Sequence, residues 1–271
     1  MQTIGLFMTN TSSQLTRNPR NTVWERGCLQ LPLFNAVIVG NGAMGTALLQ
    51  ALLENPGLHR IAVLGRAQKA PASDPRVIYI HMDAEQPDSI ERAATATRQE
   101  FERCHLLINT VGMLHTDTHK PEKRLRDVTA ECLQKSFAIN AILLPLLAQA
   151  FGPLLKHSEP AVFASLSARV GSIEDNQLGG WYSYRTAKAA HNMLLRTISR
   201  EWSLSYRNVS VVALHPGTVE SALSAPFISK SYSKRVLTAK ESGAALIAVI
   251  DKLRPGQSGD FYDWQGTRIP W

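Results

Sequence analysis

Short apolar runs alternate with helical segments along most of the chain. The runs that are short enough for strands and rich in β-branched or aromatic residues cover residues 35–39, 60–64, 77–82, 104–108, 161–166, 208–214 and 259–264. Continuous apolar strands separated by helices are typical of a parallel sheet that is covered on both faces. The pattern predicts an α/β protein with a doubly wound parallel sheet of strand order 3-2-1-4-5-6-7.

Helical periodicity marks the segments between these strands. The expected helices cover residues 46–53, 89–101, 130–155 and 241–253, together with the segment around Tyr184. Pro145 is expected to kink the helix 130–155, because proline has no N–H. Residues 222–240 are rich in Ser, Pro and Lys, which suits a mobile lid. No repeat or linker interrupts residues 35–271, so they are predicted to form one domain.

Residues 1–34 differ from the rest of the chain. They are rich in Asn, Thr, Ser and Arg, contain Glu25 as their only acidic residue, and have no apolar h-region that would indicate a secretory signal. A loosely ordered extension or a start codon placed too early is the preferred interpretation, and a transit peptide is the alternative. No apolar run in the chain is expected to span a membrane.

A glycine-rich turn joins the first strand to the first helix. It reads Gly40-Asn41-Gly42-Ala43-Met44-Gly45. The first glycine permits a tight turn, the second lets a pyrophosphate approach the backbone, and the third allows close packing of helix on strand. The N–H groups at the start of the next helix favour phosphate. Gly40, Gly42, Met44 and Gly45 are therefore predicted to bind a dinucleotide.

Residues at the ends of the second and third strands indicate which dinucleotide binds. NAD sites commonly hold the ribose 2′-OH with an acidic residue about 20 positions after the glycines, whereas this chain has Arg66 there. A guanidinium binds a 2′-phosphate through two hydrogen bonds, so NADP is favoured over NAD. The alternative is that Arg66 is a solvated loop residue. Asp83 is predicted to meet the adenine.

Polar residues also follow the next strands, at the edge where an open α/β sheet binds its ligand. They are Asn109 and Gly112 after the fourth strand, Ser167 after the fifth, and Pro216, Gly217, Thr218 and Val219 after the sixth. A hydroxyl at this edge is suited to hydrogen-bond a substrate oxygen and to help a proton donor polarise it.

Tyr184 and Lys188 carry the predicted chemistry. They are four residues apart in a segment with helical character, so they lie on one helix face. A nearby ammonium favours the phenolate and is expected to lower the tyrosine pKa, which gives an acid/base for a carbonyl or alcohol oxygen. Asn140, in the long apolar helix, must find partners when buried. It is either a structural amide or a relay residue that holds a water near the lysine.

Composition limits the other classes of function. The chain has 44% hydrophobic and 19% charged residues, which are ordinary globular values, and a net charge of +7. A solvated basic surface explains this charge, affinity for anions is the alternative, and no run of like charges indicates a nucleic-acid tail. Three cysteines without a Cys-x-x-Cys spacing fit reduced thiols in a cytosolic protein. His115 and His119 have metal-pair spacing but no third ligand, so no metal site is predicted.

From about residue 35 to the C-terminus, these motifs resemble the short-chain dehydrogenase/reductase family. The segments that resemble its C-factor/sniffer-like carbonyl reductases are residues 167–172, 179–184, 215–219 and 269–271. The resemblance implies a Rossmann fold and an NAD(P)-dependent carbonyl/alcohol reaction. It implies Tyr184 as proton donor, Lys188 as the residue that lowers its pKa and binds the nicotinamide ribose, Ser167 as substrate-orienting residue and Asn140 as holder of a relay water. It also implies dimers or tetramers.

Two departures from the family pattern are visible. The glycine loop is one residue shorter than the usual Thr-Gly-x-x-x-Gly-x-Gly, and Ala168 stands where the family often has its serine. Ser167 lies one position earlier, and Ser172 is the alternative. The sequence thus predicts a cytoplasmic, NADPH-preferring oxidoreductase for a small carbonyl or alcohol, without nucleic-acid or membrane partners. The rival is a non-catalytic dinucleotide-binding protein with a signalling or regulatory role.

Overall fold

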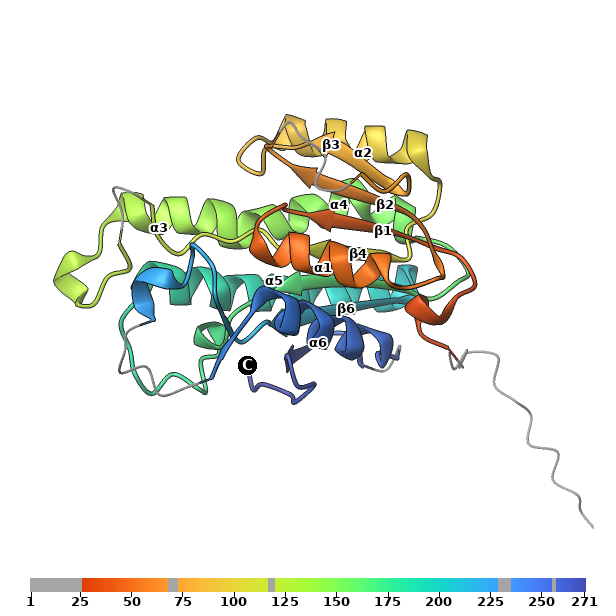
Figure 1. Cartoon of the computed structure of the whole chain (residues 1–271). Helices are drawn as coiled ribbons and strands as arrows, with labels where there is room; N and C mark the ends of the chain where they lie inside the picture. Colours follow the sequence, from red (N-terminus) through yellow and green to blue (C-terminus); the bar gives the residue numbers. More distant parts are fainter. Residues whose placement is uncertain (1–25, 68–72, 117–119, 229–234, 255–256) are drawn as a thin grey trace, which may run out of the picture.

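The computed structural model describes residues 26–67, 73–116, 120–228, 235–254 and 257–271, and a seven-stranded parallel sheet runs through its centre (Figure 1). The strands are β1 (Phe34–Val39), β2 (Leu58–Gly65), β3 (Val77–His81), β4 (Leu106–Asn109), β5 (Ala161–Leu166), β6 (Val209–His215) and β9 (Asp260–Asp263). Their order is β3-β2-β1-β4-β5-β6-β9. The predicted topology is confirmed, with β9 as the seventh strand of the sheet.

Helices cover both faces of this sheet, which is why its strands consist of almost continuous apolar residues. One face packs against α1 (Ala43–Leu53) and α6 (Ala239–Asp251). The other packs against α2 (Pro87–Glu100), α4 (Leu143–Leu155) and α5 (Tyr182–Ser205). The central residues Val37, Leu107 and Phe163 are completely buried between these layers.

The predicted helix 130–155 is continuous but irregular. It consists of α3 (Ala130–Phe137), a π-helical turn at Ala138–Ile142 that contains Asn140, and α4. The wide turn precedes Pro145, which has no N–H to donate to the preceding turn. The distortion expected at the proline therefore lies just before it.

By length and composition, this same segment is long and apolar enough to cross a membrane, contrary to the sequence-based expectation. It covers 26 residues at a mean hydropathy of 1.7, and 67% of its most apolar window is buried inside the protein. Burial of this extent is the usual state of a core helix in a globular domain. The apolar surface of α4 is used against the sheet, α2 and α5.

The N-terminal boundary of the domain lies before residue 35. Cys28 and Leu29, in a short 3₁₀ turn (Cys28–Gln30), are buried in the cluster that contains α1 and α6, and Phe34 begins β1. Residues 26–34 are therefore part of the domain and not of the loose extension that was expected over residues 1–34. Residues 1–25 lie outside the described residues. Cys28, Cys104 and Cys132 form no disulfide bond with one another.

Smaller elements cluster at the carboxyl ends of the strands. Thr218–Val219 (β7) pairs in parallel with Val236–Leu237 (β8), and a 3₁₀ turn covers Ala225–Phe227 between them. Two further 3₁₀ turns cover Leu125–Asp127 and Arg169–Gly171. The expected lid, residues 222–240, includes this region, although residues 229–234 lie outside the described part and its mobility stays a prediction.

Candidate active site at the carboxyl edge of the sheet

The glycine turn after β1 is shaped by close backbone contacts. Gly40 has a φ of +100°, a conformation that favours glycine, and a Cβ there would lie 2.5 Å from Thr110 Oγ1. A Cβ at Gly45 would overlap the carbonyl oxygen of Gly40. These two glycines therefore permit the turn and the approach of α1 to the strand.

Gly42 differs, because no atom lies within 4 Å of a Cβ built on it. It is the N-cap of α1, whose first N–H groups are available at this end of the helix. Open space beside a helix N-terminus suits a diphosphate. Met44, the second residue of α1, packs against the core below the turn. The residues present thus fit the dinucleotide that the sequence predicts.

The ends of β2 and β3 lie beside this turn. The Gly40 N–H donates to the Leu64 carbonyl at 2.8 Å, which places the end of β2 beside the glycine turn. Arg66, two residues after Leu64, is exposed there. Asp83 accepts hydrogen bonds from the Glu85 N–H at 3.0 Å and from Gln86 Nε2 at 3.3 Å. Its carboxylate thus stabilises the turn before α2, and its contact with an adenine stays a prediction.

Asn109 holds the fourth strand end in place. Its Nδ2 donates to Ser165 Oγ on the neighbouring strand at 3.0 Å, and its Oδ1 accepts the Val111 N–H at 3.1 Å. The side chain is 2% exposed. Asn109 therefore shapes the 109–112 loop rather than presenting its own amide to solvent.

Asn140, Gly112 and Lys188 converge although they are distant in sequence. A Cβ on Gly112 would lie 3.5 Å from Asn140 Oδ1 and 3.7 Å from Lys188 Nζ. The Asn140 amide binds the backbone of Met113 in both directions, at 2.7 and 3.0 Å, and donates to Ser136 Oγ at 3.1 Å. This bonding supports the structural-amide alternative for its side chain.

Tyr184 and Lys188 lie on α5 at the same edge, one turn apart. Both are buried, and Lys188 Nζ donates to the Leu166 carbonyl at 2.9 Å and lies 5.9 Å from the centre of the Tyr184 ring. Gly171 allows this approach, because a Cβ there would lie 2.8 Å from Lys188 Cβ.

The electrostatics of this pair differ from the expectation. Desolvation by burial raises the pKa of Tyr184 above its ordinary value, and burial lowers the pKa of Lys188 to about 8. The prediction that the lysine lowers the tyrosine pKa is wrong for the protein without a cofactor, because loss of water dominates at both groups. At neutral pH the phenol is protonated, and most of the Lys188 population carries its charge.

The serine predicted to orient the substrate is bound elsewhere. Ser167 Oγ donates to Asn192 Oδ1 at 2.6 Å, and its side chain is 4% exposed. The alternative, Ser172, is 1% exposed and accepts the Asp175 N–H at 3.1 Å. Ala168, next to Ser167, is partly exposed, as are Arg169 and Val170. Both hydroxyls thus serve the packing of the β5–α5 connection in this structure.

The segment that follows β6 forms a tight turn. Gly217 has a φ of +81°, and a Cβ on it would lie 2.9 Å from both Leu237 and Trp264. The Pro216 carbonyl accepts from Ser242 Oγ at 2.7 Å, while Thr218 and Val219 form β7. These four residues lie at the predicted edge, and their contact with a cofactor stays a prediction.

His191 was missed by the sequence reasoning. It is 1% exposed, its Nδ1 is 2.9 Å from the Asn140 carbonyl, and its Nε2 has no hydrogen-bond partner among the described residues. Burial and the nearby Lys188 lower its pKa to about 3, so Nδ1–H donates and the ring is neutral. The Asn140 carbonyl therefore accepts a hydrogen bond from the His191 ring. A polar residue three positions after Lys188, on the buried helix face, was the available signal.

An aromatic group above Tyr184 was also missed. The Trp181 ring lies 6.3 Å from the Tyr184 ring and 5.0 Å from the Phe227 ring, and Phe227 lies 5.8 Å from His115. His115, Trp181 and Phe227 are all partly exposed. His119, which has metal-pair spacing with His115, lies outside the described residues. These three rings come from separate segments, which is why sequence spacing did not indicate them.

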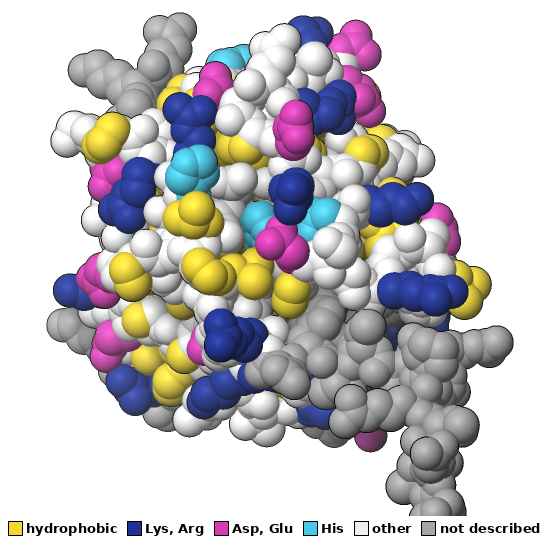
Figure 2. All heavy atoms as spheres, turned by 90° about the vertical axis from the view of Figure 1, so that its right-hand side faces the viewer, with side chains coloured by type: hydrophobic (Ala, Val, Ile, Leu, Met, Phe, Trp, Pro, Cys, Tyr) yellow, Lys and Arg dark blue, Asp and Glu magenta, His cyan; other side chains and the backbone are white. Residues whose placement is uncertain are grey.

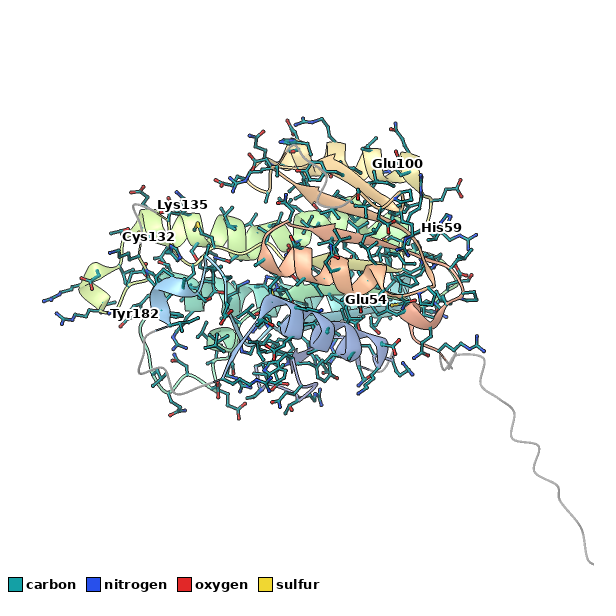
Figure 3. The ribbon with its side chains drawn as sticks, viewed as in Figure 1. Glu54, His59, Glu100, Cys132, Lys135 and Tyr182 are labelled. Carbon is teal, nitrogen blue, oxygen red and sulfur yellow. The ribbon has the colours of Figure 1, made fainter. Side chains whose placement is uncertain are left out.

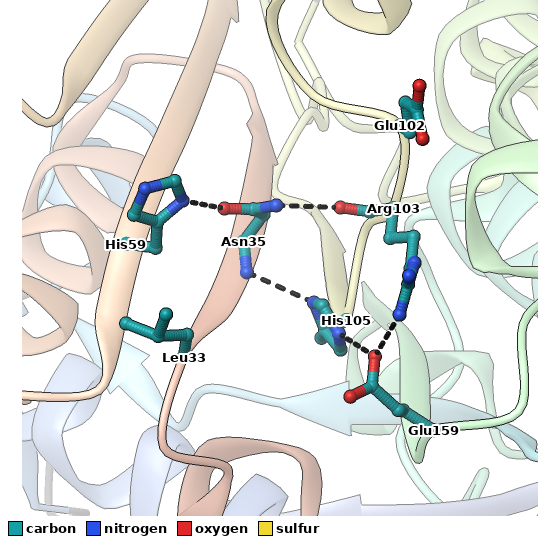
Figure 4. Close-up of a pocket in the computed structure, with 7 residues that line it drawn as sticks. All are labelled: Leu33, Asn35, His59, Glu102, Arg103, His105 and Glu159. Atoms are coloured by element: carbon teal, nitrogen blue, oxygen red, sulfur yellow. Dashed lines mark hydrogen bonds and ion pairs between the residues drawn. The ribbon is translucent and has the colours of Figure 1, made fainter.

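A second polar cluster lies at the opposite, amino edge of the sheet. A hollow of about 320 Å³ at this edge is lined by Asn35, His59, Arg103, His105 and Glu159, drawn in close-up in Figure 4. Figure 2 shows the face of the molecule on which histidine side chains gather beside acidic and basic ones. Figure 3 shows the separation: Tyr182, the first residue of α5, lies at the end of the molecule away from His59. This cluster is therefore distinct from the site that contains Tyr184.

Hydrogen bonds join most polar groups of the amino-edge cluster, and His157 Nδ1 is a buried atom without a partner among the described residues. His105 Nδ1 accepts the Asn35 N–H at 3.1 Å, so Nε2 carries the proton and donates to Glu159 Oε2 at 3.1 Å. His157, His105 and Glu159 offer three ligand atoms within 4.8 Å of one another. Because both nitrogens of His105 are already used, the arrangement is a structural network and not a prepared three-ligand metal site.

A parallel doubly wound sheet, a glycine turn at a helix N-terminus and a Tyr/Lys pair at the same edge define a dinucleotide-binding oxidoreductase of the α/β type. The family model described as short chain dehydrogenase matches residues 35–231. The chain belongs to this family, and it resembles the C-factor/sniffer-like members.

Known proteins similar to the chain agree with this assignment. The "C-signal" of Myxococcus xanthus is 35% identical over 147 residues, 54% of this chain and 83% of that protein. A 1-hydroxy-2-glutathionyl-2-methyl-3-butene dehydrogenase of a Rhodococcus species is 31% identical over 70% of this chain and 78% of that protein. The NADPH-bound carbonyl reductase from chicken fatty liver has a TM-score of 0.77 at 27% identity and covers 89% of this chain and 100% of that one.

Proposed function

We propose that this protein is a reductase of small carbonyl compounds that prefers NADPH, with Tyr184 as the proton donor. The observation that carries the proposal is the meeting of Tyr184, Lys188, Asn140 and Gly112 at the sheet edge that also holds the glycine turn. The NADPH-bound structural neighbour supports the choice of cofactor, as does Arg66 at the end of β2.

The proton chemistry follows from the burial of the pair. The glycine turn and Arg66 would hold NADPH, which would supply the hydride for the carbonyl carbon. Tyr184 Oη donates its proton to the carbonyl oxygen as negative charge develops there. Because burial raises the pKa of Tyr184, the phenol is protonated at neutral pH and ready to act in the direction of reduction. Lys188, fixed by the Leu166 carbonyl, stabilises the phenolate that is left.

The supporting residues have positioning roles in this proposal. Asn140 fixes the Met113 backbone and therefore the loop beside Lys188. Ser167 fixes α5 through Asn192 and does not touch the substrate. Because Ser167 and Ser172 are both hydrogen-bonded within the protein, Tyr184 is the principal hydrogen-bond donor to the carbonyl oxygen in this proposal. A small molecule is thus the proposed partner, and assembly into a homo-oligomer stays a proposal from the family resemblance.

The test is an assay of NADPH oxidation with a panel of aldehydes, ketones and quinones. Tyr184→Phe should lower kcat by about 10²–10⁴-fold, the usual contribution of a positioned acid, while NADPH affinity stays within about twofold. Tyr182→Phe is the matched control, because it removes a phenol two residues away on the same helix. Equal turnover of the Tyr184→Phe and wild-type proteins would contradict the role of Tyr184.

One observation favours a second candidate, a dinucleotide-binding protein without catalysis. Both candidate serines are bonded internally, and Ala168 occupies the place of the family serine. Gly42→Asp separates the two, because its side chain enters open space and opposes a diphosphate by charge. A biological effect that is lost in Gly42→Asp but retained in Tyr184→Phe would favour the binding protein.

A further inference from the structure

The residue before α5 has an unusual backbone conformation. Trp181 has φ 52° and ψ 44°, and it is the single non-glycine residue with a positive φ among the described residues. Gly179 and Gly180 before it also have positive φ, at 63° and 67°. A bulky L-residue adopts the left-handed region at an energetic cost, and such residues persist where surrounding contacts determine them.

Glu122 supplies those contacts. Its carbonyl accepts the Trp181 N–H at 2.5 Å, and its carboxylate accepts the Ser183 N–H at 3.1 Å as well as the Ser183 hydroxyl. Glu122 is 4% exposed. The start of α5 is thus tied to the loop that follows β4. These bonds hold the backbone of Trp181 in place immediately before the helix turn that carries Tyr184.

The backbone of Trp181 places its ring at the approach to Tyr184. The ring meets Tyr184 and Phe227 edge to face, at interplanar angles of 68° and 63°, and Phe227 meets His115 at 62°. We call His115, Trp181 and Phe227 the aromatic wall. Its members are partly exposed, whereas Tyr184 beneath them is 9% exposed. These rings are therefore a partly exposed aromatic surface in contact with the buried ring of Tyr184.

We propose that Trp181 is the specificity-determining residue of this site and selects carbonyl compounds whose carbonyl is attached directly to a flat ring. The inference rests on the proposed reductase function. A planar ring packs edge to face or offset against Trp181, while a puckered ring of the same size lacks the π system for this contact. The left-handed backbone of Trp181 is retained because it directs the indole to this position.

The first test compares benzaldehyde with cyclohexanecarbaldehyde, which have the same ring size and differ in flatness. The measured quantity is the ratio of their kcat/KM values, so that general loss of activity cancels. Trp181→Ala and Trp181→Gly should lower this ratio by about fivefold, the fold-change typical of an aromatic pair. Trp181→Phe should retain most of it. A ratio that is unchanged in both truncated variants would overturn the proposal.

The second test separates the strain from the loss of the ring. Trp181→Gly and Trp181→Ala both remove the indole, but only glycine adopts the left-handed backbone without cost. The glycine variant should have the higher thermal midpoint of the two. Equal midpoints would show that the backbone is not strained at Trp181 and would remove that part of the argument.

A third measurement does not depend on turnover. Benzamide and cyclohexanecarboxamide do not react, and their binding to the protein with NADP⁺ is measured by calorimetry. Tighter binding of benzamide to wild type but not to Trp181→Gly supports the proposal, and equal binding of both amides to wild type overturns it. Failure of the reductase function would appear instead as absence of turnover with both aldehydes, while the amide preference is still measured.

Discussion

The polar groups at the two edges of the sheet differ in how they are hydrogen-bonded. At the amino edge, His105 uses both ring nitrogens and Glu159 is bonded to His105 and Arg103, so that the hydrogen-bonding groups bind one another. At the carboxyl edge, glycines replace side chains, Gly42 faces open space, and His191 Nε2 lacks a described partner. At the first edge the polar side chains bind mainly one another, with His157 Nδ1 as a buried atom that has no partner among the described residues, whereas the second edge leaves backbone N–H groups beside open space. A hollow lined with histidines is therefore a weaker sign of function than backbone left uncovered.

The largest expected effect concerns the glycine turn. Gly45→Val should abolish dinucleotide binding and lower the free energy of unfolding by about 1–3 kcal/mol, because any Cβ at this position overlaps the Gly40 carbonyl. Gly42→Ala, whose methyl group meets no atom within 4 Å, is the matched control and should fold normally. Fluorescence titration with NADPH and chemical denaturation measure both quantities. Normal binding by Gly45→Val would refute the close approach of α1 to the turn.

A smaller effect is expected at the end of β2. Arg66→Ala should weaken NADPH binding by about 10–100-fold, the usual worth of a charged hydrogen bond to phosphate. NADH binding should change by less than about twofold, since it has no 2′-phosphate. Arg60→Ala, at the amino end of the same strand, is the control. Equal weakening of both cofactors would favour the solvated-loop alternative for Arg66.

Burial of His191 is expected to make the stability of the protein depend on pH. The folded protein keeps His191 neutral down to about pH 3, while the unfolded chain takes up a proton below about pH 6.5. The free energy of unfolding is thus unaffected by this group above pH 6.5. It decreases as the pH falls, by up to about 2 kcal/mol at pH 5. His191→Leu should remove this slope. Denaturation of both proteins at pH 7 and pH 5 measures it, and identical slopes would contradict a neutral buried ring.

The smallest effects are expected at the amino edge. Glu159→Gln keeps an acceptor for His105 and should cost less than about 1 kcal/mol, as for most exposed ion pairs. Glu159→Ala leaves the buried His105 Nε2–H without its acceptor and should cost about 1–3 kcal/mol. Neither variant should alter kcat of the reductase assay. A change in turnover with either one would show that the two edges are coupled.

The sequence predicted the features that depend on local patterns. Strand order followed from apolar runs and intervening helices, and the glycine turn followed from its spacing within strand, turn and helix. The Tyr184–Lys188 pair followed from helical spacing. Each of these depends on residues close together in the chain, where periodicity determines which side chains share a face.

Other features depend on which distant atoms meet, and the sequence did not reveal them. Ser167 is turned toward Asn192, 25 residues away, and His191 toward the Asn140 carbonyl, 51 residues away. The sign of the Tyr184 pKa shift depended on the depth of burial, which outweighs a lysine 5.9 Å from the ring centre. The packing of Cys28 and Leu29 against α6 likewise became visible only once both ends of the domain were assembled.

The π-helical turn at Ala138–Ile142 has a geometric consequence for the helix that contains it. A wide turn of this kind accommodates one residue more than a regular turn, and each residue of an α-helix advances by roughly 100°. The faces of α3 and α4 are therefore out of phase with those of one regular helix. The apolar stripe of α4 packs on the sheet, and Asn140, within the wide turn itself, binds the Met113 backbone. Removal of one residue from this turn would bring the two segments into phase and rotate α3 by about a quarter of a revolution relative to the rest of the domain.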